Sequence, residues 1–405
     1  MSVAERGTVP PVVSLIVGNV LFGTGLIFHA FLYNFYLEAL HLSTEVMGHA
    51  AAALTAGGLV VLLPAGAFTD RIGPRAAVTT AAAVLAAGLV LGAVAATPLA
   101  IYWAAAVAGA GGGIWRVATA PILMRVTEPR TRARAFSWNV GLLVAWAGLG
   151  TAIAGATSQW LAMRWGLQRL PAVRAALVLG AIGSAASLLV FRALRVPAAP
   201  VPDAPRAVRP AAGAPPFAVR EVLPLIGLVA AWMTGPALAA PFLNIFFSRT
   251  HGLPIERIGF IFGATSVCWA LAVIASGELA SRVGVRRMLV TSLLFFAPAM
   301  WGLSFAGTLQ LAVLLYFLQG LIAPVTNPLI DQWLLGQTPP ERQGVVSSWR
   351  QVAASASAIL GASLGGRVLA GGAFEPLFMV AGGIGLVGGL GLIVGVRLRP
   401  GRRAL

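Results

Sequence analysis

The sequence predicts an all-helical integral membrane protein whose twelve transmembrane helices form two pseudo-symmetric six-helix bundles. Of the 405 residues, 58% are hydrophobic and only 10% are charged, whereas soluble domains carry about 25% charged residues. The apolar residues occupy consecutive positions, which favours helices over the alternating strands of a membrane barrel. The second half of the chain also repeats the first at a constant offset. These observations exclude a water-soluble globular protein.

Twelve apolar stretches are each long enough to cross a hydrocarbon core about 30 Å thick. They lie at 11–37, 46–69, 75–96, 98–124, 136–158, 172–194, 219–247, 256–280, 287–306, 309–335, 345–368 and 374–397. The first stretch is too long for the apolar core of a signal peptide, so we expect it to be a retained helix. The spans leave only short connections, and no sizeable soluble domain fits between them.

The longest connection, 196–217, holds seven prolines in 22 residues and can be neither a span nor a packed domain. We predict that it is an extended, Pro/Ala-rich cytoplasmic linker. The N-terminal six-helix bundle is then expected over 1–195, and the C-terminal six-helix bundle over 218–405.

Charge predicts the orientation of the chain. The net charge is +16, and all 28 basic residues are arginine. If both termini are cytoplasmic, twenty of the 28 arginines fall on the cytoplasmic side and six on the other, which agrees with the positive-inside rule. We therefore expect a multi-pass protein of the cytoplasmic (inner) membrane. A nucleic-acid partner is not expected, because the arginines form short clusters between apolar runs instead of one basic face.

No metal centre, cofactor or enzymatic site is expected. Cys268 is the only cysteine, so the chain can form no intrachain disulfide and no thiolate metal cluster. The four histidines show no metalloprotease spacing. The spans also hold no nucleophile–base pair and no paired carboxylates. Catalysis is therefore a poor interpretation of this sequence.

The two halves repeat at an offset of 211 residues. Under this shift Phe242, Leu243, Phe246, Leu253, Glu256 and Gly259 fall on Phe31, Leu32, Phe35, Leu42, Glu45 and Gly48. The same shift superposes Pro340, Ser348, Trp349, Gly361 and Gly366 on Pro129, Ser137, Trp138, Gly150 and Gly155. Six spans separate equivalent positions, an even number, so the halves share one orientation and are related by an axis along the membrane normal.

The link after the second span reads Gly66-Ala-Phe-Thr-Asp-Arg-Ile-Gly-Pro-Arg75, and its repeat after the eighth span begins Gly277-Glu-Leu-Ala-Ser-Arg-Val-Gly-Val-Arg286. Both are similar to the G-x-x-x-D-R-x-G-R-[KR] motif of the major facilitator superfamily, and the resemblance covers essentially the whole chain. It implies a monomeric secondary transporter in the lipid bilayer, which carries a small-molecule substrate by rocker-switch alternating access. The second copy departs from the motif at Ser281, where the family usually has Asp.

The motif also supplies candidate gating residues. Arg71 and Arg75, with their repeats Arg282 and Arg286, are expected to fix the cytoplasmic side. The resemblance implies that Asp70 faces the N-terminal end of the eleventh span, 345–368, in the outward-open state, where a helix dipole favours an anion. The alternative is that Asp70 pairs locally with Arg71 or Arg75.

Arg116 is the sharpest candidate for substrate binding. It lies nine residues before Arg125, about 13 Å along a helix, and therefore near the bilayer midplane. A charge there usually faces the bundle interior or a water-filled cavity. Its repeat partner is Asn327, and a guanidinium at this depth suits a carboxylate, phosphate or sulfonate. The alternative is a structural arginine satisfied by helix carbonyls.

Two further charges have matched depths. Asp331 lies seven residues before Thr338, and Arg350 lies eight residues after Arg342 on the next helix. We predict an Asp331–Arg350 ion pair, since each group would otherwise be unpaired at depth. The pair is either a static bracket or a proton-sensitive gate.

Four polar residues complete the candidate substrate site. His29 and Tyr33 share one helix face at i, i+4 spacing, and an imidazole can carry a proton near neutral pH. A proton is therefore the candidate coupling ion, although a lone histidine can equally be a hydrogen-bonded core residue. Asn244 is the repeat partner of Tyr33, and Gln319 is a weaker candidate for the cavity wall.

The leading functional interpretation is a carrier of a small anionic or zwitterionic solute, because Arg116 would bind a negative group. Drug or lipid efflux by proton antiport is the alternative. The fifth span reads Gly148-Leu-Gly-Thr-Ala-Ile-Ala-Gly155, without the proline that drug exporters of the resembled family commonly carry there. An interpretation of a different class is a membrane receptor that binds a solute without transporting it.

Overall fold

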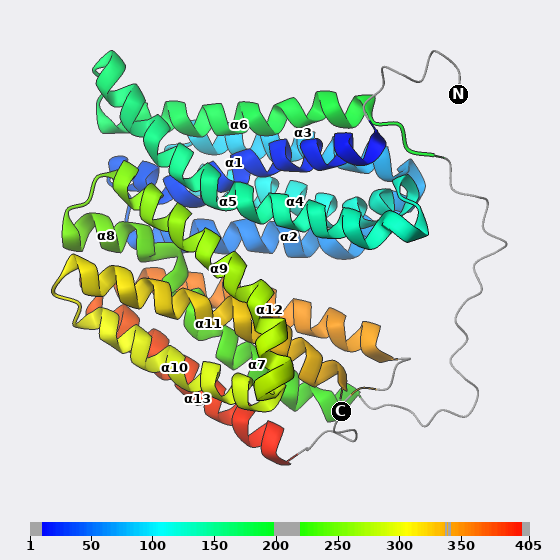
Figure 1. The fold of residues 1–405 in the computed structure, drawn as a ribbon. Helices are drawn as coiled ribbons and strands as arrows, with labels where there is room; N and C mark the ends of the chain where they lie inside the picture. Colours follow the sequence, from blue (N-terminus) through cyan, green and yellow to red (C-terminus); the bar gives the residue numbers. More distant parts are fainter. Residues whose placement is uncertain (1–9, 198–218, 337, 339–341, 399–405) are drawn as a thin grey trace. The chain divides into compact units, whose positions relative to one another are not determined.

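The computed structural model describes residues 10–197, 219–336, 338 and 342–398, and every regular element in these ranges is a helix (Figure 1). Most of the predicted linker, 196–217, lies outside the described residues. The elements are α1 (Pro11–Ala39), α2 (Thr44–Ile72), α3 (Pro74–Val94), α4 (Pro98–Val126), α5 (Pro129–Trp165), α6 (Arg169–Ala193), α7 (Val219–Ala239), the 3-10 helix η2 (Ala240–Phe242), α8 (Leu243–His251), α9 (Ile255–Val283), α10 (Val285–Ser304), α11 (Leu309–Gly336), α12 (Gln343–Leu369) and α13 (Glu375–Leu398).

The predicted transmembrane architecture is confirmed. In the described part of the chain, eleven helices are long and apolar enough to cross a membrane, and one of these is the continuous stretch Leu223–His251, which joins α7, η2 and α8. The twelfth predicted span is α4, which is 29 residues long and carries Arg116. A helix of that length rises about 43 Å, more than the hydrocarbon core requires.

Prolines mark where several helices begin. α1, α3, α4 and α5 each start on a proline in the first turn. The ring fixes φ near the helical value, and the missing N–H is one that a first turn leaves unpaired in any case. The sequence therefore fixes these four N-termini locally, before any packing between helices.

The seventh span is broken, although the sequence predicts one uninterrupted helix over 219–247. α7 ends at Ala239, a 3-10 turn follows, and α8 continues from Leu243. Pro236 lies inside α7 and Pro241 lies in the first turn of η2. Each proline removes a backbone donor and clashes with the preceding turn, so the break has a local cause. The equivalent positions in the continuous α1 are Gly25 and Ala30.

The 211-residue repeat extends to backbone conformation. Gly73, between α2 and α3, has a φ of 82°, and its equivalent Gly284, between α9 and α10, has a φ of 93°. The turn after the first span is made by His41 with a φ of 58°, where the second half has Gly252 with a φ of 63°. Positive φ is costly for any residue with a Cβ atom, so His41 holds a conformation better suited to glycine.

The repeat extends to side-chain hydrogen bonds as well. Thr127 Oγ1 donates to the carbonyl of Leu123 over 2.6 Å, and the equivalent Thr338 Oγ1 donates to that of Leu334 over 2.9 Å. After each of these threonines, a long side chain reaches back to the end of the preceding helix. Arg132 Nη2 donates to the Met124 carbonyl, and Gln343 Nε2 donates to the equivalent Leu335 carbonyl.

By its internal contacts the chain forms two units. The first comprises 1–42, 53–202 and 253–267, and the second comprises 43–52, 203–252 and 268–405. Each unit therefore includes one short segment from the other half of the sequence: the start of α9 belongs to the first unit, and the start of α2 to the second. The proposed boundaries of the two bundles, 1–195 and 218–405, stay a prediction.

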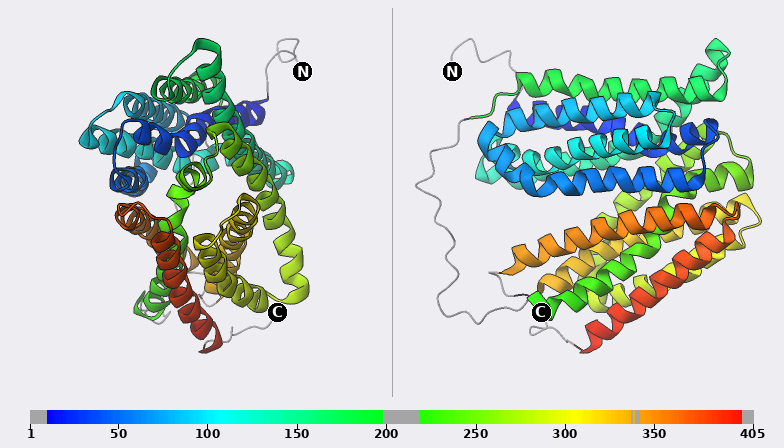
Figure 2. Two further views of the ribbon diagram at one scale, coloured as in Figure 1. Left: turned by 90° about the vertical axis from the view of Figure 1, so that its left-hand side faces the viewer. Right: turned by 180° about the vertical axis from the view of Figure 1, so that it is seen from behind.

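Within the first unit, α1 packs along α5 and α6, and α3 packs along α4 and α6 (Figures 1 and 2). The buried core holds Phe22 of α1 and Phe191 of α6, both 0% exposed, together with many alanines. Gly18 of α1 lies beside the Phe191 ring, and a Cβ atom there would come within 2.4 Å of that ring. Small residues thus allow the large ones to fit between helices.

The start of α9 packs against α5 in the first unit through glycine. A Cβ atom on Gly259 would lie 2.9 Å from the Thr151 carbonyl oxygen, and one on Gly155 would lie 3.3 Å from Gly259 Cα. The equivalent contact in the second unit joins the start of α2 to α12, where a Cβ atom on Gly48 would lie 2.3 Å from the Ala362 oxygen. The residues of one contact map onto those of the other at the offset of 211.

Polar groups reinforce only the second of these contacts. Thr44 Oγ1 donates to the Gly366 carbonyl over 3.0 Å, and Glu45 lies 3.3 Å from Arg367 in an ion pair. In the first unit the position equivalent to Arg367 is Ala156, so Glu256 cannot form the matching ion pair. The two glycine contacts therefore have the same backbone packing, but only the contact of α2 with α12 carries this ion pair among the described residues.

Replacing His41 with glycine is expected to stabilise the protein, since it relieves the positive φ of the turn. We expect His41→Gly to raise the free energy of unfolding by about 1 kcal/mol, measured as a higher melting temperature in detergent. His41→Ala is the control, because it removes the imidazole and keeps the backbone penalty. An equal gain from alanine would show that the side chain, and not the backbone, is responsible.

Candidate functional site

Arg116 lies near the middle of α4, a helix held against its neighbours by backbone contact. A Cβ atom on Gly109 would lie 1.8 Å from the Leu54 oxygen of α2, and one on Gly113 would lie 2.6 Å from the Gly58 oxygen. A Cβ atom on Gly111 would likewise lie 2.5 Å from the Leu85 nitrogen of α3. These contacts require glycine, and they explain the glycine cluster that precedes Arg116.

The Arg116 side chain is exposed. One turn before it, Gly112 has no neighbour within 4 Å of an added Cβ atom, and one turn after it Ala120 is exposed. Trp103, whose side chain is 67% exposed, lies on another side of α4, about 140° round the helix from Arg116. The guanidinium therefore stands on an open face lined by small residues. Among the described residues it has no hydrogen bond or ion pair.

A buried hydrogen-bond network fixes α4 beside this arginine. Trp115 Nε1 donates to Asn19 Oδ1 of α1 over 2.8 Å, and Asn19 Nδ2 donates to Asn139 Oδ1 of α5 over 2.8 Å. The Trp115 ring also stacks on Phe22 with centroids 5.0 Å apart. Asn19 is 0% exposed and Asn139 is 7% exposed. Three helices thus meet at the residue next to Arg116, which sets the direction in which the guanidinium points.

This network is not among the contacts predicted from the sequence. Asn19 and Asn139 are polar residues inside predicted spans, and a polar group at that depth is a signal for a partner. The sequence does not show which residues pair, because Asn19 and Asn139 are 120 positions apart. In the sequence Trp115 cannot be told apart from the other large apolar residues of its span, so its hydrogen bond to Asn19 is not predicted.

The ion pair predicted from matched depths is present. Arg350 Nε of α12 contacts Asp331 Oδ1 of α11, and the two side chains are 14% and 42% exposed. Asn327, one turn before Asp331, is half-buried on the same helix, and Gln319 is 8% exposed. α11 thus carries three of the predicted polar residues. Whether the ion pair gates transport stays a prediction.

His29 and Tyr33 lie inside the first unit. Their rings are in contact, with centroids 4.0 Å apart and planes tilted by 31°, and the two residues are 6% and 5% exposed. The Tyr33 hydroxyl donates to the Gly92 carbonyl of α3 over 3.4 Å. Asn244 is also buried, at 4% exposed, and its Oδ1 accepts the Ile245 N–H over 2.9 Å. Their roles in substrate binding or proton coupling stay predictions.

The motif carboxylate, Asp70, is exposed in the last turn of α2. A negative charge is unfavourable at the C-terminal end of a helix, yet no ion pair is found for Asp70 among the described residues. The alternative of a local pair with Arg71 or Arg75 is not seen, since Arg75 donates to the Arg192 carbonyl at the end of α6. Asp70 is therefore available for a contact formed in another state.

The second copy of the motif uses its charges differently. Arg282 bonds Glu278 of the same helix through Nε over 2.9 Å, one turn apart. Arg286 is exposed at the start of α10. The acidic partner in this copy is thus Glu278, eight residues before Arg286, and not a residue at the usual Asp position. In the first copy Asp70 has no ion pair among the described residues, whereas in the second copy Arg282 is paired with Glu278.

The described residues contain no cluster of three or more histidine, cysteine or carboxylate side chains that could hold a metal ion. Cys268 is exposed and unbonded. The prominent polar groups among the described residues are hence the Arg116 guanidinium in the first unit and the Asp331–Arg350 ion pair in the second unit. Such groups can bind and release an anion and can respond to protonation.

Removing the central amide of the network should weaken both the packing and the placement of Arg116. We expect Asn19→Leu to lower the free energy of unfolding by about 0.6–2 kcal/mol, the range measured for hydrogen bonds between membrane helices. Unfolding in mixed detergent micelles measures it. Asn139→Leu is the matched control and should cost less, because it leaves the Trp115–Asn19 bond intact. A smaller loss from Asn19→Leu than from Asn139→Leu would contradict this account.

Comparisons with known proteins agree with the architecture. The Major Facilitator Superfamily model matches residues 14–239 and 225–404. The chain is 24% identical over 161 residues to the multidrug export protein EmrB of Escherichia coli K12, covering 37% of this chain and 31% of that protein. It is 26% identical over 175 residues to the fatty acid resistance protein FarB of Neisseria gonorrhoeae, covering 40% and 34%. The matches span about a third of the length of these curated relatives.

Solved structures show the same fold. The nucleoside transporter NupG superposes with a TM-score of 0.77 at 14% identity, over 95% of this chain and 99% of that one. A bacterial homologue of the lysosomal transporter Spinster, in an inward-facing and occupied conformation, superposes with a TM-score of 0.76, over 96% and 95%. With a family match over nearly all of its length and eleven helices of membrane-spanning length and composition among its described residues, this chain belongs to the Major Facilitator Superfamily and is a multi-pass membrane transporter.

Proposed function

We propose that this transporter exports an organic anion with an apolar body, and that Arg116 binds the negative group. The observation that carries the proposal is the exposed Arg116 guanidinium in the middle of α4, which has no partner among the described residues. A charge at that depth is costly unless it serves a ligand or lines a wet cavity. The helix face around it offers room, because Gly112 and Ala120 flank it.

The chemistry of arginine favours a carboxylate, sulfonate or phosphate. The planar guanidinium can form two parallel hydrogen bonds to such a group. The rest of the substrate would contact a mostly apolar protein, which favours a body that is itself apolar. EmrB and FarB are named for multidrug export and fatty acid resistance, and these names support export and an amphipathic substrate.

Export of amphipathic drugs irrespective of their charge is the second candidate. The matches to EmrB favour it. In that case binding would depend on apolar surface, and Arg116 would be a structural residue. A receptor that does not transport is the third interpretation, and counterflow in proteoliposomes separates it from both exporters, since a receptor would bind ligand without exchange.

The proposal includes the mechanism and the orientation. The transporter works by alternating access in the cytoplasmic membrane, with both termini cytoplasmic, and a proton is the coupling ion. The distribution of arginine supports the orientation. The exposed carboxylate of Asp70 and the Asp331–Arg350 pair supply charges that can change partners between states.

Replacing Arg116 should weaken the binding of anions. With decanoate as the probe, we expect Arg116→Ala to weaken binding by about 10- to 150-fold, because a charge-assisted hydrogen bond contributes about 1.5–3 kcal/mol. Thermal stabilisation of purified protein by decanoate measures it. Arg164→Ala, at an exposed arginine near the end of α5, is the matched control and should leave binding unchanged. Undiminished stabilisation of Arg116→Ala would assign the site to apolar contacts and favour the second candidate.

Neutralising Asp331 tests proton gating. If the Asp331–Arg350 pair opens on protonation, wild-type counterflow should change with pH, and Asp331→Asn should make it nearly independent of pH. Glu278→Gln, which removes the partner of Arg282, is the control and should keep the wild-type profile. An Asp331→Asn variant with an unaltered pH profile would make the pair a static bracket.

A further inference from the structure

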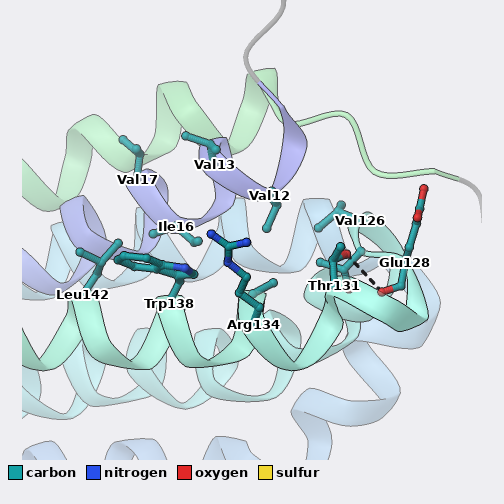
Figure 3. A pocket seen from close by; sticks show the side chains of 12 residues that line it. Val12, Val13, Ile16, Val17, Val126, Glu128, Thr131, Arg134, Trp138 and Leu142 are labelled. Atoms are coloured by element: carbon teal, nitrogen blue, oxygen red, sulfur yellow. Dashed lines mark hydrogen bonds between the residues drawn. The ribbon is translucent and has the colours of Figure 1, made fainter.

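A groove opens between α1 and α5 at the end where both helices begin (Figure 3). Its volume is about 690 Å³, within the range of ligand-binding cavities. It is lined by Val12, Val13, Ile16, Val17, Val126, Thr127, Glu128, Thr131, Arg134, Ala135, Trp138 and Leu142. All of these residues belong to the first unit.

The groove lies along the N-terminal parts of α1 and α5. The two helices are joined by the Asn19–Asn139 hydrogen bond of 2.8 Å, and most of the residues that line the groove precede these two asparagines in their helices. Val13 and Val17 of α1 are left 44% and 45% exposed. The floor of the groove is therefore apolar and uncovered by other described residues.

The uncovered face of α1 points away from the interior of the unit. Thr24 lies seven residues after Val17, about two turns along the same face. There the face is covered: Trp146 of α5 bonds the Thr24 hydroxyl over 3.1 Å, and Gly183 of α6 lies against its methyl group. Nearer the helix start, that cover is missing over Val17. A face that α5 and α6 cover further along the helix is an outer face of the unit, so its exposed valines are placed to meet the hydrocarbon of one leaflet.

One cation is placed at the rim of this apolar groove. Arg134 rises from α5 toward α1, beside Trp138 (Figure 3). Arg134 is exposed, and among the described residues it has no hydrogen bond or ion pair. By contrast, Arg132 is engaged by the carbonyls of Met124 and Thr127. Glu128 also lines the groove, at the start of α5.

The lining changes from polar to apolar along α5. Arg134, Trp138 and Leu142 follow at successive turns, so about 12 Å separate the charge from the last apolar residue. Trp138 is 53% exposed, and tryptophan prefers the depth where headgroups meet acyl chains. A second groove, between α10 and α11, has a volume of about 420 Å³, and the described residues that line it are uncharged. A cation at the rim thus distinguishes the groove of α1 and α5 from the groove of α10 and α11.

We propose that this groove is a binding site for a phospholipid with an anionic headgroup. One acyl chain lies along Val13, Val17 and Leu142, and the phosphate pairs with the Arg134 guanidinium. Both adjoining helices begin at this end, so their positive N-terminal dipoles add to the attraction. The site is separate from Arg116, and it does not depend on which solute is transported.

The test uses the full chain in phosphatidylcholine nanodiscs doped with phosphatidylglycerol. Bromine atoms on the acyl chains of either lipid quench nearby tryptophan fluorescence, and the contribution of Trp138 is the difference between the wild type and Trp138→Phe. Brominated phosphatidylglycerol should quench Trp138 at lower mole fractions than brominated phosphatidylcholine. Arg134→Gln should reduce this preference about five-fold, since one basic side chain near the surface contributes about 1 kcal/mol to anionic lipid binding.

Two variants make the result decisive. Arg130→Gln, at an exposed arginine of the same end that does not line the groove, should keep the preference. Val17→Phe, which fills the apolar floor, should reduce quenching by both lipids. Equal quenching of Trp138 by the two lipids in the wild type would reduce the groove to an ordinary contact with bulk lipid. An equal loss from Arg130→Gln and Arg134→Gln would attribute the preference to diffuse surface charge. Either outcome overturns the proposal.

Discussion

Close backbone contact between helices is the constraint on which this structure depends. Lipid is as apolar as the side chains, so there is little hydrophobic drive to bring two helices together, and packing must supply it. Gly109 and Gly113 hold α4 against the carbonyls of α2, and Gly259 and Gly48 hold the starts of α9 and α2 against their neighbours. These contacts fix the direction in which the Arg116 face of α4 points, because α4 cannot rotate about its axis while its glycines pack against α2. A substitution at Gly109 would therefore act on Arg116 without touching it.

Much of the fold could be predicted from sequence because its determinants are local or repeated. Span length follows from runs of apolar residues, and the offset of 211 residues reappears in the paired turns at Gly73 and Gly284. The Asp331–Arg350 contact could be predicted because two charges at equal depth on successive helices have few other partners. The partners of Asn19 could not be predicted, since a contact between residues 120 positions apart depends on how α1, α4 and α5 are arranged in space. The break in the seventh span was missed although Pro236 and Pro241 are visible in the sequence.

The two repeats share a backbone and differ in charge. The Glu45–Arg367 pair and the Thr44 hydrogen bond reinforce one glycine contact, and Ala156 leaves the other without a matching cation. Both members of the ion pair are well exposed, so its contribution is small and screened by salt. The motif copies differ in the same way, since Asp70 has no ion pair within the described part of the chain and Arg282 bonds Glu278 within its own helix. Repetition thus preserved the close contacts, which glycine dictates, and left the charges free to diverge.

The break at η2 has a mechanical consequence. α1 is one continuous helix from Pro11 to Ala39, and the corresponding span of the second half is divided at Ala240–Phe242 between two prolines. Missing amide donors and a tighter three-residue turn make that point more compliant than an intact α-helix. The seventh span will therefore bend more readily than the first. Asn244 lies in α8, just after the break. The same movement will therefore bend the seventh span more than its equivalent, the first span.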